Sequence, residues 1–409
     1  MRIRLTWIAA IIALVLIGLL IACSTKYSSS SNGLVVVPSQ GSAVMESFSL
    51  DLANGHVTEI NNINGPPTPG IPTSIVLDPA GAFAYVIVYQ NVALPGSATG
   101  IATFQIASDG KMSYIATAQM TNPVAIAIDS AGKFLFVANG SEGTVSVFSV
   151  GSGASLTEVA GSPFPLPMPL GGQPPTASAL AVTPTVYPIA YSYCSGFTAP
   201  TTENLYVTDS INYLVLNYQV ASSGMLVPQI VSPTVPGVPT GSTPDGVTVD
   251  PCNRFAYVSN GFGSTANSVS AYTICSAVNT ASQPNCPTPP DFSLHLVKGS
   301  PYPVGDNPGP LTVDAYGGFL YVLNVGSSQI SSFRMSPTTG ALTPLSPPTV
   351  NTGLGPTSIA IRSDDSWMFV ANLTAGTLSQ YGVTPATGQL TPQSQPVSTF
   401  DYPSGVAVK

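Results

Sequence analysis

Charged side chains are scarce in this sequence, and positively charged ones are the scarcest. Of its 409 residues only 10 are Lys or Arg and 2 are His, against 18 Asp and Glu, so the formal net charge is −8. Proteins that bind nucleic acids need clustered Lys and Arg to displace the counterions of the phosphates. The composition therefore argues against a nucleic-acid partner.

Motifs that would assign a particular chemistry are also absent. The sequence has no Gly-rich phosphate loop, no GxSxG nucleophile elbow, no CxxC pair and no Cys/His cluster with zinc spacing. It has no long amphipathic helical stretch either. Its 38 Gly and 40 Pro instead separate short apolar segments. This composition favours repeated β structure over several unrelated domains.

The N-terminus predicts export. Arg2 and Arg4 precede an apolar run from Trp7 to Ala22, which is typical of a secretory signal peptide over 1–22. Cys23 follows the run directly and resembles the acylated Cys of bacterial lipoproteins. The alternative is a membrane-spanning helix, but the run has 16 residues where spanning needs about 20.

A lipid anchor on Cys23 implies that residues 23–33 form a flexible tether, because Ser and Gly bury too little apolar area to become ordered. The expected location is the bacterial cell envelope. Ser24 after the acylated Cys, in place of Asp, favours the outer membrane, with the periplasmic or the surface face left open.

Setting Cys23 aside leaves four cysteines, an even number that suits an oxidising compartment. Cys275 and Cys286 flank a loop rich in Pro and Ser, which predicts a local disulfide. Cys194 and Cys252 then form the expected second pair. The alternative is that these thiols are free and buried.

A motif of Pro followed six residues later by Asp, with alternating apolar residues between, recurs along the chain. Clear copies read PTSIVLD, PVAIAID, PDGVTVD and PGPLTVD, and degenerate copies read PTASALAV, PTSIAIR and PSGVAVK. The spacing of successive prolines is 51, 52, 69, 64, 48 and 47 residues, a period typical of β-propellers. The copies begin at Pro72, Pro123, Pro175, Pro244, Pro308, Pro356 and Pro403.

Each copy predicts four β-strands, A to D, and seven copies of strand D predict seven blades. The segment 34–37 matches strand B with no strand A before it, and 405–409 matches strand A with nothing after it. Together they complete one blade, so the last strand closes the ring and removes an open sheet edge. The predicted fold is an all-β, seven-bladed propeller over 34–409, and we expect it to be a monomer.

The repeat also carries a family resemblance. The segment 125–150, AIAIDSAGKFLFVANGSEGTVSVFSV, resembles YVTN-type propeller repeats. The whole of 34–409 resembles the seven-bladed lactonase family, which includes bacterial 6-phosphogluconolactonase and fungal carboxymuconate cyclase. The resemblance implies lactone hydrolysis or cyclisation at the top mouth of the central channel, which the D–A and B–C loops surround. The His, Arg and Glu set of that family has no matching positions here.

The predicted top-face loops contain no Arg, Lys or His, and both His56 and His295 fall in outer strand D. A phosphorylated or carboxylated substrate would need cations to offset its desolvation. The top face instead carries carboxylates. They are either turn caps and solvated loop residues or the ligands of a calcium ion or a neutral sugar. These weak candidates are Glu142, Asp209, Asp245, Asp306 and Asp401.

Two functions follow from these observations. The favoured one is a lipid-anchored scaffold that binds a protein or glycan partner of the envelope, because the catalytic cations are missing. The alternative is a lactone hydrolase that acts on a neutral lactone outside the cytoplasm. A convergent carboxylate site at the channel mouth would favour the hydrolase.

Overall fold

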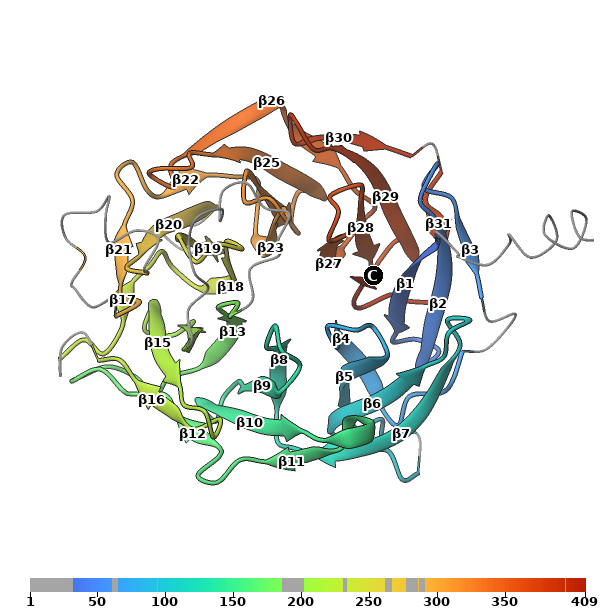
Figure 1. Cartoon of the computed structure of the whole chain (residues 1–409), viewed down its shortest axis with the longest axis horizontal. Helices are drawn as coiled ribbons and strands as arrows, with labels where there is room; N and C mark the ends of the chain where they lie inside the picture. The colour runs from blue at the N-terminus through green and yellow to red at the C-terminus, as the bar shows by residue number, and fades with distance from the viewer. Residues whose placement is uncertain are drawn as a thin grey trace, which may run out of the picture.

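The computed structural model describes residues 32–60, 65–93, 95–185, 202–230, 234–261, 267–276, 286, 291–393 and 395–409. These residues form seven antiparallel sheets that follow one another around a ring (Figure 1). The predicted seven-bladed β-propeller is confirmed. The only helix among the described residues is one 3-10 turn at Ser152–Ala154.

The four strands of each blade run from the centre of the ring to its rim. The innermost strands are β4 (Ile71–Leu77), β8 (Pro123–Ile128), β13 (Ala177–Val182), β18 (Pro244–Val249), β23 (Pro308–Val313), β27 (Pro356–Ile361) and β32 (Ala407–Val408). The second strands are β1 (Asn32–Ser39), β5 (Phe83–Tyr89), β9 (Phe134–Asn139), β14 (Glu203–Asp209), β19 (Phe255–Asn260), β24 (Phe319–Asn324) and β28 (Trp367–Asn372).

The third strands are β2 (Val44–Asp51), β6 (Gly100–Ile106), β10 (Thr144–Val150), β15 (Leu214–Val220), β20 (Ser268–Ile274), β25 (Gln329–Met335) and β29 (Thr377–Thr384). The outer strands are β3 (Val57–Glu59), β7 (Met112–Gln119), β11 (Leu156–Glu158), β16 (Leu226–Pro228), β21 (Leu294–Leu296), β26 (Leu342–Asn351) and β30 (Gln389–Pro392).

The outer edge of the blades differs from the sequence prediction. Parts of the expected D–A loops pair with the third strand a second time, as the short strands β12 (Phe164–Pro165), β17 (Val238–Pro239), β22 (Tyr302–Pro303) and β31 (Val397–Ser398). In two blades, β7 and β26 run through this region without interruption. Backbone groups of the third strand would otherwise lack partners, which explains why the chain follows it so far.

The ring closes as predicted. In the first blade β1 pairs antiparallel with β32, with Val35 opposite Val408 and Val36 opposite Ala407. Backbone hydrogen bonds between Leu34 and Lys409, of 3.2 and 2.9 Å, extend this pairing. The two ends of the described chain therefore share one sheet, which leaves no open inner edge.

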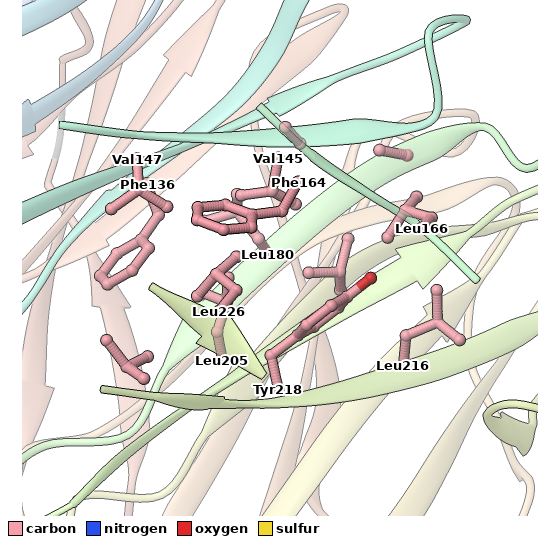
Figure 2. Close-up of a cluster of buried hydrophobic side chains, with 14 of the residues drawn as sticks. Phe136, Val145, Val147, Phe164, Leu166, Leu180, Leu205, Leu216, Tyr218 and Leu226 are labelled. Carbon is pink, nitrogen blue, oxygen red and sulfur yellow. The ribbon is translucent and has the colours of Figure 1, made fainter. Parts of the chain in front are cut away.

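Apolar side chains fill the spaces between neighbouring blades. Seven large hydrophobic clusters each join one blade to the next around the ring. Figure 2 shows the one between the third and fourth blades, where Phe136 and Val145 face Leu205 and Tyr218. Because each blade alone would leave both faces exposed, its burial depends on both neighbours.

Tyrosine hydroxyls add polar links across these interfaces. On the second strand, Tyr206 donates to the Phe292 carbonyl, Tyr257 to the Gly340 carbonyl and Tyr321 to the Gly388 carbonyl, over 2.7 to 3.0 Å. Each accepting carbonyl belongs to the turn before the outer strand of the next blade. Tyr85 occupies the same place in the second blade, but its buried hydroxyl has no hydrogen-bond partner among the described residues.

The cysteines and the N-terminus are described in part. Cys275 and Cys286 form the predicted disulfide, with Cα atoms 5.2 Å apart. Cys252 is also disulfide-bonded, but its predicted partner Cys194 lies outside the described residues. So do the predicted signal peptide and Cys23. No helix in the described part of the chain is long and apolar enough to cross a membrane.

The tyrosine links predict different effects of the same substitution at two sites. Tyr321→Phe leaves the buried Gly388 carbonyl unpaired, so we expect the free energy of unfolding to fall by about 1 kcal/mol. Tyr85→Phe removes a buried hydroxyl that has no partner, so we expect stability to stay the same or rise. Urea unfolding of both variants measures the difference. An equal loss of unfolding free energy in the two variants would contradict the view that only the Tyr321 hydroxyl links neighbouring blades.

Candidate functional site

A β-bulge follows the repeat proline at the start of the inner strands. The pairing with the second strand slips by one residue between Pro72 and Ser74, Pro123 and Ala125, Pro244 and Gly246, and Pro356 and Ser358. The extra residue lies directly after the proline. Because side chains alternate along a strand, such an insertion redirects its side chain. Proline, which lacks an N–H, is tolerated at this irregular position.

The bulged residues line a cavity of about 440 Å³ in the central channel. Six of the seven blades contribute to its wall. The residue that follows each proline is Thr73, Val124, Asp245 or Thr357, and all four are part of the lining. The remaining wall is apolar or hydroxyl-bearing, with Ser74, Ala125, Ile126, Ser178, Ala179, Leu180, Gly246, Val247, Pro310, Leu311, Val325 and Pro356.

Hydroxyl groups next to the cavity hold neighbouring blades together. Ser178 Oγ donates to the Pro244 carbonyl over 2.7 Å, and Ser404 Oγ donates to the Pro72 carbonyl over 2.8 Å. Thr357 Oγ1 donates to the Pro403 carbonyl over 3.3 Å. The repeat proline therefore supplies an acceptor to the blade before it. These hydrogen bonds fix the positions of the bulges around the channel.

Asp245 is the only charged residue in the lining of this cavity, and no Lys, Arg or His of the described chain shares it. Its side chain is exposed to the channel, and partial desolvation by the surrounding protein still raises the pKa of the carboxyl above its ordinary value. No hydrogen bond or positive charge among the described residues opposes this rise. A carboxyl in that state suits proton transfer.

Gly246 in β18 and Gly309 in β23 allow the two inner strands to approach each other at Asp245. A β-carbon on Gly309 would lie only 3.3 Å from Asp245 Oδ2, and one on Gly246 only 2.6 Å from the Gly309 carbonyl. Ser259 Oγ also donates to that carbonyl, over 2.7 Å. The inner strands β18 and β23 thus approach closely, and this contact determines where Asp245 lies.

The other predicted carboxylates do not join Asp245. Asp209 is buried and caps a turn, because its Oδ1 accepts from the backbone N–H groups of Thr176 and Ile211 at 3.0 and 3.2 Å. Glu142, Asp306 and Asp401 are exposed on separate loops. Among the described residues no group of three or more His, Cys, Asp or Glu could hold a metal ion.

The histidines and cations are placed as the sequence indicates. His56 is exposed just before β3, and His295 lies within β21, both at the rim of the ring. Arg254 is buried in an ion pair with Asp250, with Nη2 and Oδ2 2.7 Å apart. None of these side chains reaches the channel cavity.

A buried acid that the sequence analysis missed is Glu46 in β2. It is 3% exposed and accepts hydrogen bonds from Ser39 Oγ and, over 3.0 Å, from the Phe400 N–H. Burial raises the pKa of its carboxyl to about 7. In other blades a serine such as Ser146 holds this place and accepts from an asparagine seven residues earlier. The spacing from Ser39 to Glu46 is the same and could have revealed it.

Comparison with known proteins agrees with this architecture. The family model described as "Lactonase, 7-bladed beta-propeller" matches residues 20–163 and 296–409. The chain belongs to the lactonase family of seven-bladed β-propellers. A search of curated proteins found no match to this lactonase-family propeller.

Solved structures show the same fold at low sequence identity. The periplasmic gluconolactonase of Pseudomonas aeruginosa is 19% identical, with a TM-score of 0.69 over 92% of this chain and 99% of its own. A protein of Bacteroides uniformis that carries the provisional name 6-phosphogluconolactonase is 17% identical, with a TM-score of 0.71 over 93% and 100%. At these identities the comparison shows only that this lactonase-family propeller has the same fold as the two proteins.

The buried acids predict an unusual dependence of stability on pH. Glu46, Glu203 and Asp314 all have pKa values raised to about 7 by burial. Between the ordinary carboxyl pKa of about 4 and pH 7 the folded chain therefore holds more protons than the unfolded chain. We expect the free energy of unfolding to fall as the pH rises through this window.

Substitution of one acid tests this. In Glu46→Gln the fall should shrink but persist, since the other acids of raised pKa remain. The exposed Glu142→Gln is the matched control and should leave the fall unchanged. Urea unfolding at pH 4.5 and pH 8 provides the measurement. A stability that rises over this interval in the wild type would contradict the expectation.

Proposed function

We propose that this protein hydrolyses a neutral lactone in the channel cavity, with Asp245 as the general base. The observation that carries the proposal is a single carboxyl of raised pKa that faces an otherwise uncharged cavity. Membership of the lactonase family supports the reaction class. The volume of about 440 Å³ lies within the usual range for small-molecule sites.

The lining favours an uncharged substrate. A phosphate or carboxylate beside Asp245 would be repelled, and the cavity has no Lys or Arg to compensate. Strand β4, which carries Thr73 and Ser74, lies across the channel from β18 (Figure 1), and no group of the described chain bonds to the hydroxyls of these two residues. They can donate to the carbonyl oxygen of the lactone, as a developing oxyanion requires.

The reaction balances with water as the only co-reactant. Asp245 takes a proton from water as the water oxygen bonds to the lactone carbonyl carbon. The tetrahedral intermediate then collapses, and the bond between the carbonyl carbon and the ring oxygen breaks. Asp245 returns the proton to the departing ring oxygen, which leaves a hydroxy acid and the regenerated carboxylate.

This proposal reverses the order of the two functions expected from the sequence. The scaffold was favoured because the top-face loops lack cations, and a neutral lactone does not need them. The gluconolactonase of similar fold is described as periplasmic, which is compatible with a neutral sugar lactone as substrate outside the cytoplasm. A glycan or protein partner remains the second candidate, supported by the exposed loops of the same face.

Replacement of the proposed base tests the function directly. Asp245→Asn should lower kcat for a neutral lactone such as δ-gluconolactone by at least about 100-fold, because the amide cannot accept a proton. Asp401→Asn, an exposed carboxylate of the same face, should retain wild-type kcat. Proton release in a weakly buffered assay measures both. Full activity of Asp245→Asn would refute the role of Asp245.

We also propose that the propeller acts in the cell envelope, anchored through Cys23. The apolar run before Cys23 supports this, and the Cys275–Cys286 disulfide suits an oxidising compartment. A second copy is not needed to complete the cavity, so we propose a monomer.

The anchor can be tested by fractionation. We expect wild-type protein to sediment with membranes and Cys23→Ala to lose the acyl groups, as intact mass would show. Cys252→Ala, which keeps the N-terminus, is the control and should stay with the membranes. Wild-type protein without acyl groups in the soluble fraction would contradict the anchor.

A further inference from the structure

A second cavity, of about 300 Å³, lies at the boundary between the second and third blades. It shares no lining residue with the channel cavity. Its lining contains two carboxylates and no Lys, Arg or His, and we call it the acidic pocket. The residues of its wall that matter here are Met120, Asn139, Glu142, Phe148, Glu158 and Pro163.

One repeat position explains why a pocket opens in this blade. Three residues before the repeat proline, the fifth, sixth and seventh blades have Gly241, Gly305 and Gly353. A β-carbon on these glycines would lie 2.5, 2.7 and 2.7 Å from the side-chain amide of the asparagine that ends the second strand. The loop therefore packs directly on that amide. The third blade has Met120 at this position, so its loop cannot approach Asn139 as closely.

Asn139 keeps an unpaired acceptor beside the pocket. It is 4% exposed, and its Nδ2 donates to two hydroxyls of β10 over 2.9 and 3.0 Å, but its Oδ1 has no partner among the described residues. In the fifth and seventh blades the corresponding oxygen accepts from the glycine loop, from Thr240 Oγ1 and from the Gly353 N–H. The Oδ1 of Asn324 in the sixth blade also lacks a partner, but there the glycine loop covers the amide. Only Asn139 combines the unpaired oxygen with this pocket, and a donor from a ligand would remove the cost of leaving it unpaired.

Hydrogen bonds hold the two carboxylates of the pocket in place. Ser162 Oγ donates to Glu158 Oε1 over 2.9 Å and accepts from a backbone N–H of β10 over 3.0 Å. Glu142 belongs to the turn between β9 and β10, where Asn122 Nδ2 donates to Ser141 Oγ over 2.9 Å. The pocket therefore presents two negative charges that no cation of its lining neutralises.

These groups suit an organic ammonium ion better than a metal ion. A primary ammonium has three N–H donors and no acceptor, which fits two carboxylates and an amide oxygen. Calcium takes about six to eight oxygen ligands, and no group of three or more His, Cys, Asp or Glu in the described chain could hold a metal. Phe148, Met120 and Pro163 offer apolar surface for a short alkyl chain, and an aromatic ring also attracts cations.

We propose that the acidic pocket binds a small primary alkylammonium ion, with the ammonium group at Glu142 and Glu158 and the alkyl chain against Phe148. The volume of about 300 Å³ lies at the lower end of the range for small-molecule sites, which agrees with a ligand of few atoms. This inference is independent of the proposed lactone hydrolysis, because Asp245 lies in the other cavity.

Titration calorimetry of the full-length protein with n-butylammonium chloride tests the inference. We expect binding, and we expect Glu142→Gln and Glu158→Gln each to raise the Kd at least about tenfold, because each removes a hydrogen bond to a charged group. n-Butanol has the same alkyl chain without the charge and should bind at least about tenfold more weakly.

Glu59→Gln is the matched control. Glu59 lies opposite Phe48 in the first blade as Glu158 lies opposite Phe148 in the third, but it is outside the acidic pocket. This variant should bind n-butylammonium as the wild type does.

Four results would overturn the inference. The first is no binding of n-butylammonium at millimolar concentrations, and the second is unchanged binding in both pocket variants. Equal affinity for n-butanol would show that the pocket recognises only the alkyl chain. Displacement of n-butylammonium by an equal concentration of calcium chloride would assign the carboxylates to a metal ion.

Discussion

The structure depends on one local feature, the repeat proline and the β-bulge that follows it at the start of the inner strands. The proline carbonyl accepts a hydrogen bond from a hydroxyl of the preceding blade, as Pro244 does from Ser178. The bulged residue that follows points into the channel, as Asp245 does. The same few residues thus align neighbouring blades and supply the channel wall, so blade packing and the chemistry of the channel are coupled.

The coupling explains how a fold built from near-identical repeats acquires a single reactive position. Thr73, Val124 and Thr357 occupy the bulge in three other blades, and none of them ionises near neutral pH. Among these four described bulges only that of the fifth blade carries a carboxyl, and Gly309 of the next blade leaves space for it. Substitution at one repeat position changes the chemistry of the channel without a change in the fold.

Much of this fold could be predicted from the sequence because its signals are local and repeated. Proline spacing predicted the blades, and the unmatched segments 34–37 and 405–409 predicted the closure that β1 and β32 form. Of five candidate carboxylates, Asp245 alone lines the cavity, which depends on strand pairing rather than on loop position. Glu46 was missed for a related reason, since one of its hydrogen bonds comes from Phe400 at the far end of the chain.

The central claim is that the Asp245 carboxyl, with its raised pKa, activates water in the channel. The pH dependence of kcat/KM for a neutral lactone, corrected for spontaneous hydrolysis, tests this most directly. The account predicts a rise with pH through an inflection above the ordinary aspartate pKa of about 4, and no such inflection in Asp245→Asn. The same inflection in both proteins would contradict it.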